Sequence, residues 1–312
     1  MLRDRHRFRR LAWGALAYTL LVILWGGYVR ASGSGAGCGA HWPLCNGEVV
    51  PRSATAETLI ELTHRVTSGL ALPLVLVLLA WAFRAFPKGS PVRKGAAFVV
   101  AFMVLEAAVG AGLVLFEQVA YNASIGRAYW MASHLVNTFL LLGALTLTAH
   151  AARGGAMPRL RGSGRRGPLV GGALLGLLVL GASGAVTALG DTLALGGGLD
   201  PAEEPVVATL VGLRLYHPLL ACLVVGLFAW AVYHVRRADP GGPAAFLGLV
   251  TLALMLVQLA VGLVNVQLRA PIPLQLVHLL VTDLIWIGAV LFAAEALGAG
   301  QYTRRPLRAS TA

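Results

Sequence analysis

The sequence predicts an all-α polytopic membrane protein with eight transmembrane helices, arranged as two pseudo-symmetric four-helix bundles. Three observations predict this fold. Of the 312 residues, 57% are apolar and 12% are charged, and the mean hydropathy is +0.75, which is typical of membrane proteins. Long apolar stretches alternate with short basic loops. The second half of the chain also repeats a pattern of the first.

Eight apolar stretches are long enough to cross a hydrocarbon core of roughly 30 Å as helices. Helices are the expected spanning elements, because a strand barrel would show short segments of alternating polarity. In chain order the stretches are approximately Leu11–Val29, Leu59–Phe83, Gly95–Phe116, Tyr129–Ala151, Pro168–Thr187, Gly212–Val235, Ala244–Gln267 and Leu274–Leu297.

The basic residues predict how these helices are oriented. Nineteen of the 25 Lys and Arg residues lie in the N-terminal segment, the C-terminal segment and the three loops that share one side of the membrane with them. Cytoplasmic loops carry an excess of Lys and Arg, so both termini are expected to be cytoplasmic in a multi-pass plasma-membrane protein. No helix carries a solvated basic face, so the formal net charge of +12 does not indicate nucleic-acid binding.

The loop GCGAHWPLCNG at residues 37–47 then lies on the extracytoplasmic side. Thiols oxidise there, so Cys38 and Cys45 are expected to form a disulfide. The loop has two interpretations: a structural lid over the first bundle, which we favour, or a thiol pair that takes part in redox chemistry. Cys222, inside the sixth helix, is expected to be a small buried side chain.

Four motifs recur in both halves of the chain. IELTHRVTSGL at residues 60–70 is echoed by LRLYHPLLACL at 213–223, and MASHLVNTFLL at 131–141 by LQLVHLLVTDL at 274–284. Gly27 corresponds to Gly181, and Glu106 corresponds to Gln258. An even number of helices per repeat gives both halves the same orientation. We therefore expect a first half at 1–153, a cytoplasmic linker at 154–167 and a second half at 168–312.

His64, His134, His217 and His278 are the echoed residues, two in each half. Each lies four to six residues inside the outer end of its apolar stretch, which corresponds to a depth of roughly 6–9 Å. A lone intramembrane histidine is equally well explained as a packing residue, but four at one depth indicate ligands. Paired imidazoles on facing helices suit haem iron. A zinc site would need further ligands close by.

The two halves differ three residues before the first histidine of each pair, where Glu61 corresponds to Arg214. An arginine near the outer edge of a haem can pair with a propionate. Glu61 has two interpretations: a carboxylate that relays protons or positions water, or one favoured by the helix dipole. We infer that the first half carries out chemistry and the second holds a haem for electron transfer.

The stretch GGYVRASGSGAGCGAHWPLCNG at 26–47 closely resembles the first outer loop of haem A synthases, and ELTHR at 61–65 resembles their Glu-x-x-His-Arg motif. The resemblance extends over nearly the whole chain. It implies an oxidoreductase that converts haem O into haem A, by oxidising a porphyrin methyl group to a formyl group through hydroxylated intermediates, for use in terminal oxidases.

Carried over to this sequence, the resemblance implies the following roles. His64 and His134 hold the substrate haem, and Glu61 is the functionally important acid. His217 and His278 ligate a haem b that passes electrons. Cys38 and Cys45 match the outer-loop cysteine pair. Some relatives carry a second pair before the sixth helix. Gly190–Leu210 has none, so exchange between two disulfides is not expected here.

The implied partners are a haem O synthase that supplies the substrate, the assembly machinery of terminal oxidases, membrane lipid and an unidentified electron partner. One alternative is a dihaem b-type electron-transfer cytochrome without haem-modifying activity. It explains the four histidines equally well, but neither the loop motif nor the Glu61–Arg214 difference. A second alternative, a haem or ion transporter, predicts helices broken at mid-membrane instead.

Overall fold

The computed structural model describes residues 2–120, 122–159 and 162–298, and within them the only regular elements are helices. Eight helical segments are long and apolar enough to cross a membrane, which confirms the predicted fold class. The α-helices are α1 (Leu2–Ala31), α2 (Ala56–Ala85), α3 (Pro91–Leu115), α4 (Ile125–Ala152), α5 (Arg166–Asp191), α6 (Pro205–Gly212), α7 (Tyr216–Ala238), α8 (Pro243–Gln267) and α9 (Ile272–Gly298).

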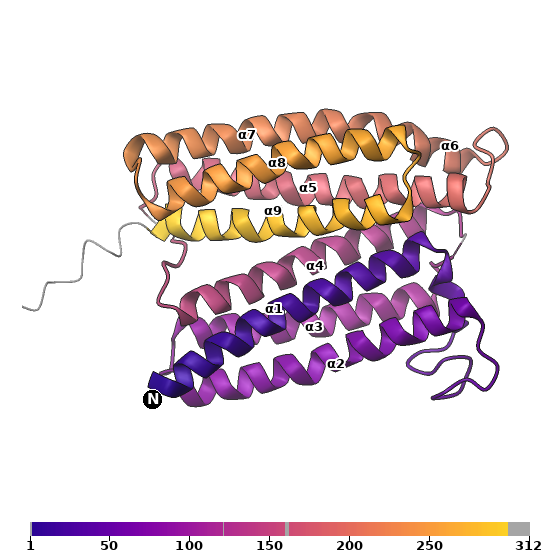
Figure 1. Ribbon diagram of the computed structural model, residues 1–312, viewed down its shortest axis with the longest axis horizontal. Helices are drawn as coiled ribbons and strands as arrows, with labels where there is room; N and C mark the ends of the chain where they lie inside the picture. The colour runs from indigo at the N-terminus through magenta and orange to yellow at the C-terminus, as the bar shows by residue number, and fades with distance from the viewer. Residues whose placement is uncertain (1, 121, 160–161, 299–312) are drawn as a thin grey trace, which may run out of the picture.

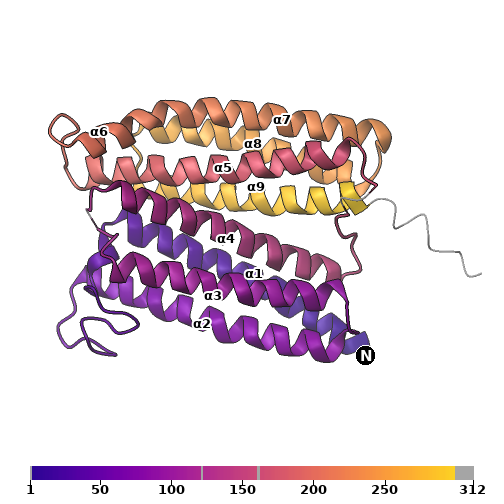
Figure 2. The ribbon, with the colours of Figure 1, turned by 180° about the vertical axis from the view of Figure 1, so that it is seen from behind.

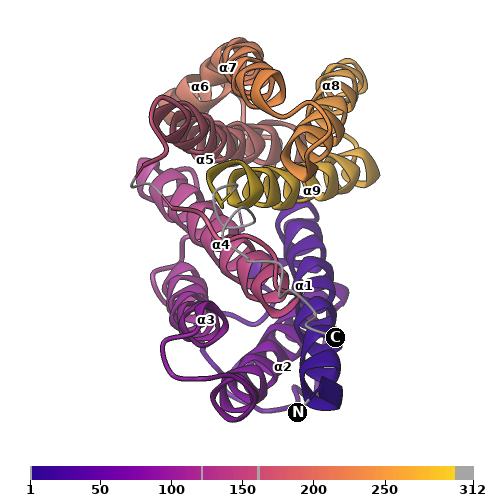
Figure 3. The ribbon, with the colours of Figure 1, turned by 90° about the vertical axis from the view of Figure 1, so that its left-hand side faces the viewer.

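The helices form two groups that lie side by side (Figure 1). In one group α1 contacts α2 and α4, and α3 fills the space between those two helices. In the other, α5 contacts α7 and α9, and α8 lies between them. Each group is therefore a ring of four long helices, as the end-on view shows (Figure 3). The twofold relation between the halves stays a prediction.

The interface between the rings is formed by α4, which packs against α5 and α9, and by α1, which also packs against α9. In the most apolar 18 residues of α4 the buried share is 61%, compared with at most 44% in the corresponding stretch of any other span. Phe139 of α4 stacks on Trp286 of α9 with ring centroids 5.3 Å apart, and the Trp286 indole donates a hydrogen bond of 2.5 Å to the Phe139 carbonyl. The two halves are thus joined by a packed core.

Local sequence explains where several helices begin. Thr55, Ser90 and Ser124 precede α2, α3 and α4, and each side chain accepts a hydrogen bond from the backbone N–H three residues later. Such caps satisfy donors that the first helical turn leaves without partners. Because the helices begin at these caps, they extend beyond the apolar stretches.

The sixth predicted helix differs from expectation. Instead of one helix over Gly212–Val235, α6 and α7 are separated by a 3₁₀ turn at Leu213–Leu215. Pro218 gives the physical reason: it has no N–H to donate to the carbonyl of Arg214, and its ring clashes with that carbonyl. Cys222 on α7 is also exposed rather than buried, on a helix face that would meet lipid.

The start of α1 and the end of α9 lie at the same end of the bundle, opposite the loop at 37–47 (Figures 1 and 2). We call the end that carries this loop the cysteine-loop end. The assignment of this end to the extracytoplasmic side stays a prediction. Four arginines that contributed to it, Arg161, Arg304, Arg305 and Arg308, lie outside the described residues.

Candidate functional site

The four predicted histidines lie on the second and fourth long helix of each ring: His64 on α2, His134 on α4, His217 on α7 and His278 on α9. His64 and His134 are close enough to interact electrostatically, and so are His217 and His278. These helices are diagonal in their rings, so each pair faces across a bundle interior. Among the described residues no group of three or more His, Cys, Asp or Glu could hold a metal ion.

The predicted depth of 6–9 Å stays a prediction, because it is counted from the outer ends of the apolar stretches. Within the helices, His64 follows the start of α2 by eight residues and His134 that of α4 by nine, which is about 12–14 Å along the axis at 1.5 Å per residue. The first turns of both helices lie outside the apolar stretches. His278 lies six residues into α9, about 9 Å from the start of that helix.

A glycine on a neighbouring helix packs against each imidazole. A Cβ atom added to the glycine would lie within 4 Å of the histidine Cε1 in every case. The pairs are Gly26 with His64 (2.9 Å), Gly110 with His134 (3.9 Å), Gly184 with His217 (3.1 Å) and Gly262 with His278 (3.3 Å). A side chain at Gly26 would displace the His64 ring. The glycines therefore let the helix backbone approach the rings closely.

The ring nitrogens test whether these residues suit a haem. In metal sites a histidine that binds through one nitrogen donates the other N–H to an acceptor. His217 Nδ1 lies 2.8 Å from the Ser183 hydroxyl, and His134 Nδ1 lies 3.6 Å from Glu106. The Nδ1 atoms of His64, His134 and His278 are buried and have no hydrogen-bond partner among the described residues, so the contact of His134 with Glu106 is electrostatic. Paired imidazoles inside an apolar ring fit bis-histidine ligation of a haem.

Glu106 on α3 was paired with Gln258 in the sequence but was given no role. Its carboxylate accepts hydrogen bonds of 2.5 Å from Asn137 and from Thr138, both on α4. In the second half the Gln258 amide instead donates to the His278 carbonyl (2.8 Å) and to Thr282 (2.5 Å). The first pair therefore has a carboxylate beside it where the second has a neutral amide. The signal in the sequence that could have identified Glu106 was its charge within an apolar stretch.

Glu61 is 3% exposed and has two partners. It accepts a hydrogen bond of 2.8 Å from the backbone N–H of Cys38 and forms an ion pair with Arg65. Arg65 also donates to the carbonyls of His41 and Leu44. Glu61 therefore holds the cysteine loop against α2, one helical turn from His64. The sequence placed Glu61 correctly beside His64 but gave no indication of this contact with the loop.

Arg214 lies in the 3₁₀ turn before α7 and forms an ion pair with Asp191 at the end of α5. The sequence analysis expected Arg214 to face a haem propionate and did not identify Asp191. Asp191 lies beyond the predicted end of the fifth helix, Thr187, because α5 itself extends to Asp191 before a π-helical turn at Thr192–Gly196.

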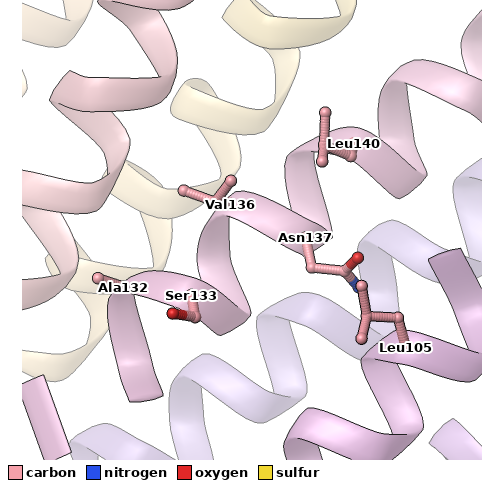
Figure 4. Close-up of a pocket in the computed structure, with 6 residues that line it drawn as sticks. All are labelled: Leu105, Ala132, Ser133, Val136, Asn137 and Leu140. Atoms are coloured by element: carbon pink, nitrogen blue, oxygen red, sulfur yellow. The ribbon is translucent and has the colours of Figure 1, made fainter. Parts of the chain in front are cut away.

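One cavity lies along α4, and another is lined by His217. One, of about 340 Å³, lies between α3 and α4 and is lined by Ser133, next to His134, and by Asn137, which holds Glu106 (Figure 4). The other, of about 420 Å³, is lined by His217 and Ser183 between α5 and α7. The remaining lining of both is almost wholly apolar.

Cys38 and Cys45 form the predicted disulfide, and both are buried. The bridge closes a ring with a sequence separation of seven residues. The Cys38 carbonyl also accepts a hydrogen bond of 2.9 Å from the Asn46 N–H. Together with the Cys38–Glu61 contact, the bridge gives the loop one fixed shape over the first ring.

Replacing Cys38 and Cys45 together by serine is expected to destabilise the docked loop by roughly 2–3 kcal/mol, because the open ring regains conformational entropy. Hydrogen exchange followed by mass spectrometry on peptides covering 37–47 is expected to be roughly 30- to 150-fold faster. Cys222→Ser is the matched control and is expected to leave exchange in the loop unchanged. Equal exchange in the double variant and the parent protein would contradict the role of the bridge.

Comparison with known proteins bears on what these sites bind. A family model described as "Cytochrome oxidase assembly protein" matches residues 9–290. The chain is 44% identical over 113 residues to the heme A synthase of Geobacillus kaustophilus, covering 35% of this chain and 36% of that protein. It is 36% identical over 126 residues to the heme A synthase of Halalkalibacterium halodurans, covering 40% and 42%.

A longer match is to a protein with a different name. Over 299 residues the chain is 51% identical to a protoheme IX farnesyltransferase of Thermus thermophilus. This match covers 94% of the chain but 49% of that protein, so the chain spans about half the length of this relative. The family match over most of the chain and the two heme A synthases agree with each other. The chain therefore belongs to the haem A synthase family of cytochrome oxidase assembly proteins.

Proposed function

We propose that the protein is an oxidoreductase that converts haem O into haem A. In this proposal the first half binds the substrate haem between His64 and His134, and the second half binds a haem b between His217 and His278. The observation that carries the proposal is that two similar histidine pairs have different charged neighbours. Glu61 and Glu106 lie near the first pair, whereas Arg214 and Gln258 lie near the second.

When bound, the haem groups supply the redox-active iron and, in the first half, the methyl group that is oxidised. Conversion of the methyl to a formyl group takes up one water and releases four protons and four electrons, through an alcohol and a hydrated aldehyde. Protons therefore have to leave the first half, and a carboxylate near the substrate is suited to accept them. The electrons pass by way of the second half to an acceptor that is still unidentified.

Within this scheme the residues of the chain have separate tasks. His64 and His134 fix the substrate in the ring from opposite sides. Glu61 accepts a proton from the attacking water, and its ion pair with Arg65 fixes the position of this carboxylate. The disulfide-closed loop covers the ring above Glu61 and limits the access of bulk water. Glu106 on α3 places a negative charge 3.6 Å from the His134 Nδ1.

The apolar cavity between α3 and α4 supports entry of the substrate from the bilayer, because a farnesylated haem is amphipathic and partitions into lipid. The Thermus relative supports a functional link with haem O formation, since it is named a protoheme IX farnesyltransferase and about half of its length lies outside the match. We infer that a haem O synthase supplies the substrate and that the product serves terminal oxidase assembly. The protein then lies in the plasma membrane with its cysteine loop outside.

Co-expression with a haem O synthase, followed by chromatography of the extracted haems, tests this function. We expect haem A to accumulate, and we expect the purified protein to contain haem b together with haem O or haem A. Haem b alone, with haem O unchanged in the membranes, would support the dihaem cytochrome and contradict the synthase. Cells that express the haem O synthase alone are the control.

A further inference from the structure

Arg30, at the end of α1, reaches out of its own half. Its guanidinium donates hydrogen bonds to the Ala188 carbonyl (3.1 Å) and the Thr192 hydroxyl (2.7 Å) near the end of α5, and to the Gln275 side-chain oxygen (2.9 Å) on α9. All three acceptors belong to the second half. A cationic group of the first half therefore lies in the second ring, at its cysteine-loop end.

Along the helix axes, the Arg30 guanidinium lies close to the level of His217 and His278. Gln275 precedes His278 by three residues on α9, and Arg214 precedes His217 by three. Three residues of helix correspond to about 4.5 Å along the axis. Arg30 also interacts electrostatically with Asp191, the ion-pair partner of Arg214. Arg30, Asp191 and Arg214 thus form one cluster about a helical turn beyond His217 and His278.

The cluster carries more positive than negative charge. Arg30 and Arg214 share a single carboxylate, that of Asp191, which interacts with both. Arg127 of α4 lies near Arg30 as well and is 3% exposed. The Nε atoms of Arg127 and Arg214 are buried and have no hydrogen-bond partner among the described residues. Charge that is removed from water without a counter-ion is costly, above all in a membrane. The excess of guanidinium groups therefore indicates a site for an anion.

We propose that Arg30 and Arg214 together bind the carboxylates of a dianionic ligand in the second ring, so that a residue of the first half completes the site of the second. On the proposed function this ligand is the haem b held by His217 and His278, with its two propionates directed to the cysteine-loop end. Arginine is well suited to this contact, because its planar fork matches a carboxylate in a bidentate, charge-assisted pair. The second half then does not bind its haem independently of the first.

Haem transfer to apomyoglobin tests this proposal. The rate at which purified Arg30→Gln protein loses haem b is expected to be roughly 10- to 100-fold higher than in the parent, the effect of removing a charge-assisted hydrogen bond. Arg30→Lys keeps the positive charge but not the planar guanidinium, so its rate of haem b loss is expected to lie between those of the parent and Arg30→Gln. Arg52→Gln is the matched control, because Arg52 is an exposed arginine at the same end of the molecule, and its ion-pair partner among the described residues is Glu48.

Reconstitution with the dimethyl ester of haem b identifies the ligand group. If Arg30 binds propionates, the ester is lost at similar rates from the parent and from Arg30→Gln. An equal effect of the substitution on haem b and on the ester would overturn the proposal and would assign the cluster to another anion, such as a lipid phosphate. Haem loss unchanged by Arg30→Gln would also overturn it. A parent protein that binds no haem b would instead contradict the proposed function, so the two failures are distinguishable.

Discussion

Replacing His217 or His278 by alanine is expected to abolish the low-spin haem b signal of the purified protein. On the proposed function each residue would hold the haem iron from one side, and the partner imidazole alone cannot keep the iron in a six-coordinate low-spin state. The expected result is a loss of about half of the total haem, measured by pyridine haemochrome, together with loss of the bis-histidine spectrum of the second half. On the same proposal conversion of haem O is expected to stop as well, because the second half would no longer carry electrons away from the first.

His234→Ala is the matched control, since His234 lies on the same helix as His217 but is exposed at the opposite end, where it packs on Trp230 and Tyr233. We expect this variant to retain the haem content and spectrum of the parent. The assignment would be wrong if His217→Ala and His278→Ala kept the full low-spin signal, or if His234→Ala lost it to the same extent.

Replacing Glu61 by glutamine is expected to lower haem A formation by roughly 10²- to 10⁴-fold, the range for loss of a general base. Glutamine keeps an oxygen that can accept the Cys38 N–H, so the cysteine loop is expected to stay docked. Haem content is expected to be unchanged, because neither axial histidine is altered. The measurement is chromatography of haems extracted after co-expression with a haem O synthase, with hydrogen exchange of residues 37–47 on the same variant.

Glu57→Gln is the control for this experiment, because Glu57 lies one turn earlier on α2 and is exposed. It is expected to form haem A at the parental rate. Undiminished haem A formation in Glu61→Gln would remove this carboxylate from the mechanism. Lower activity accompanied by faster exchange in the loop would give Glu61 a positioning role through Cys38 rather than a role as base.

The spanning segments could be predicted from the sequence because hydropathy alone determines which stretches enter a membrane. The ends of the helices could not, since they depend on polar caps such as Thr55 and Ser124 outside the apolar stretches. The break before α7 follows from Pro218, a signal present in the sequence but outweighed by the length of the apolar stretch.

The site residues divide in a similar way. The echoed histidines and the cysteine pair could be found from the sequence because repetition and spacing are linear properties. Glu106 was visible only as a charged residue, and its place 3.6 Å from His134 depends on how α3 packs against α4. The contacts of Glu61 with Cys38 and of Arg214 with Asp191 likewise join segments separated by more than 20 residues.

By itself the sequence determined that the chain is an eight-helix membrane protein, that it carries four echoed histidines, and that two cysteines form a bridge in the loop between its first two helices. These features depend on composition, periodicity and local spacing, which the order of residues contains directly. Only the tertiary structure decided which helices are neighbours, that α4 and α1 join the two rings, and that Arg30 of the first half reaches α5 and α9 of the second. The physical reason is that such contacts depend on side-chain packing between distant segments, for which no local pattern in the chain is a guide.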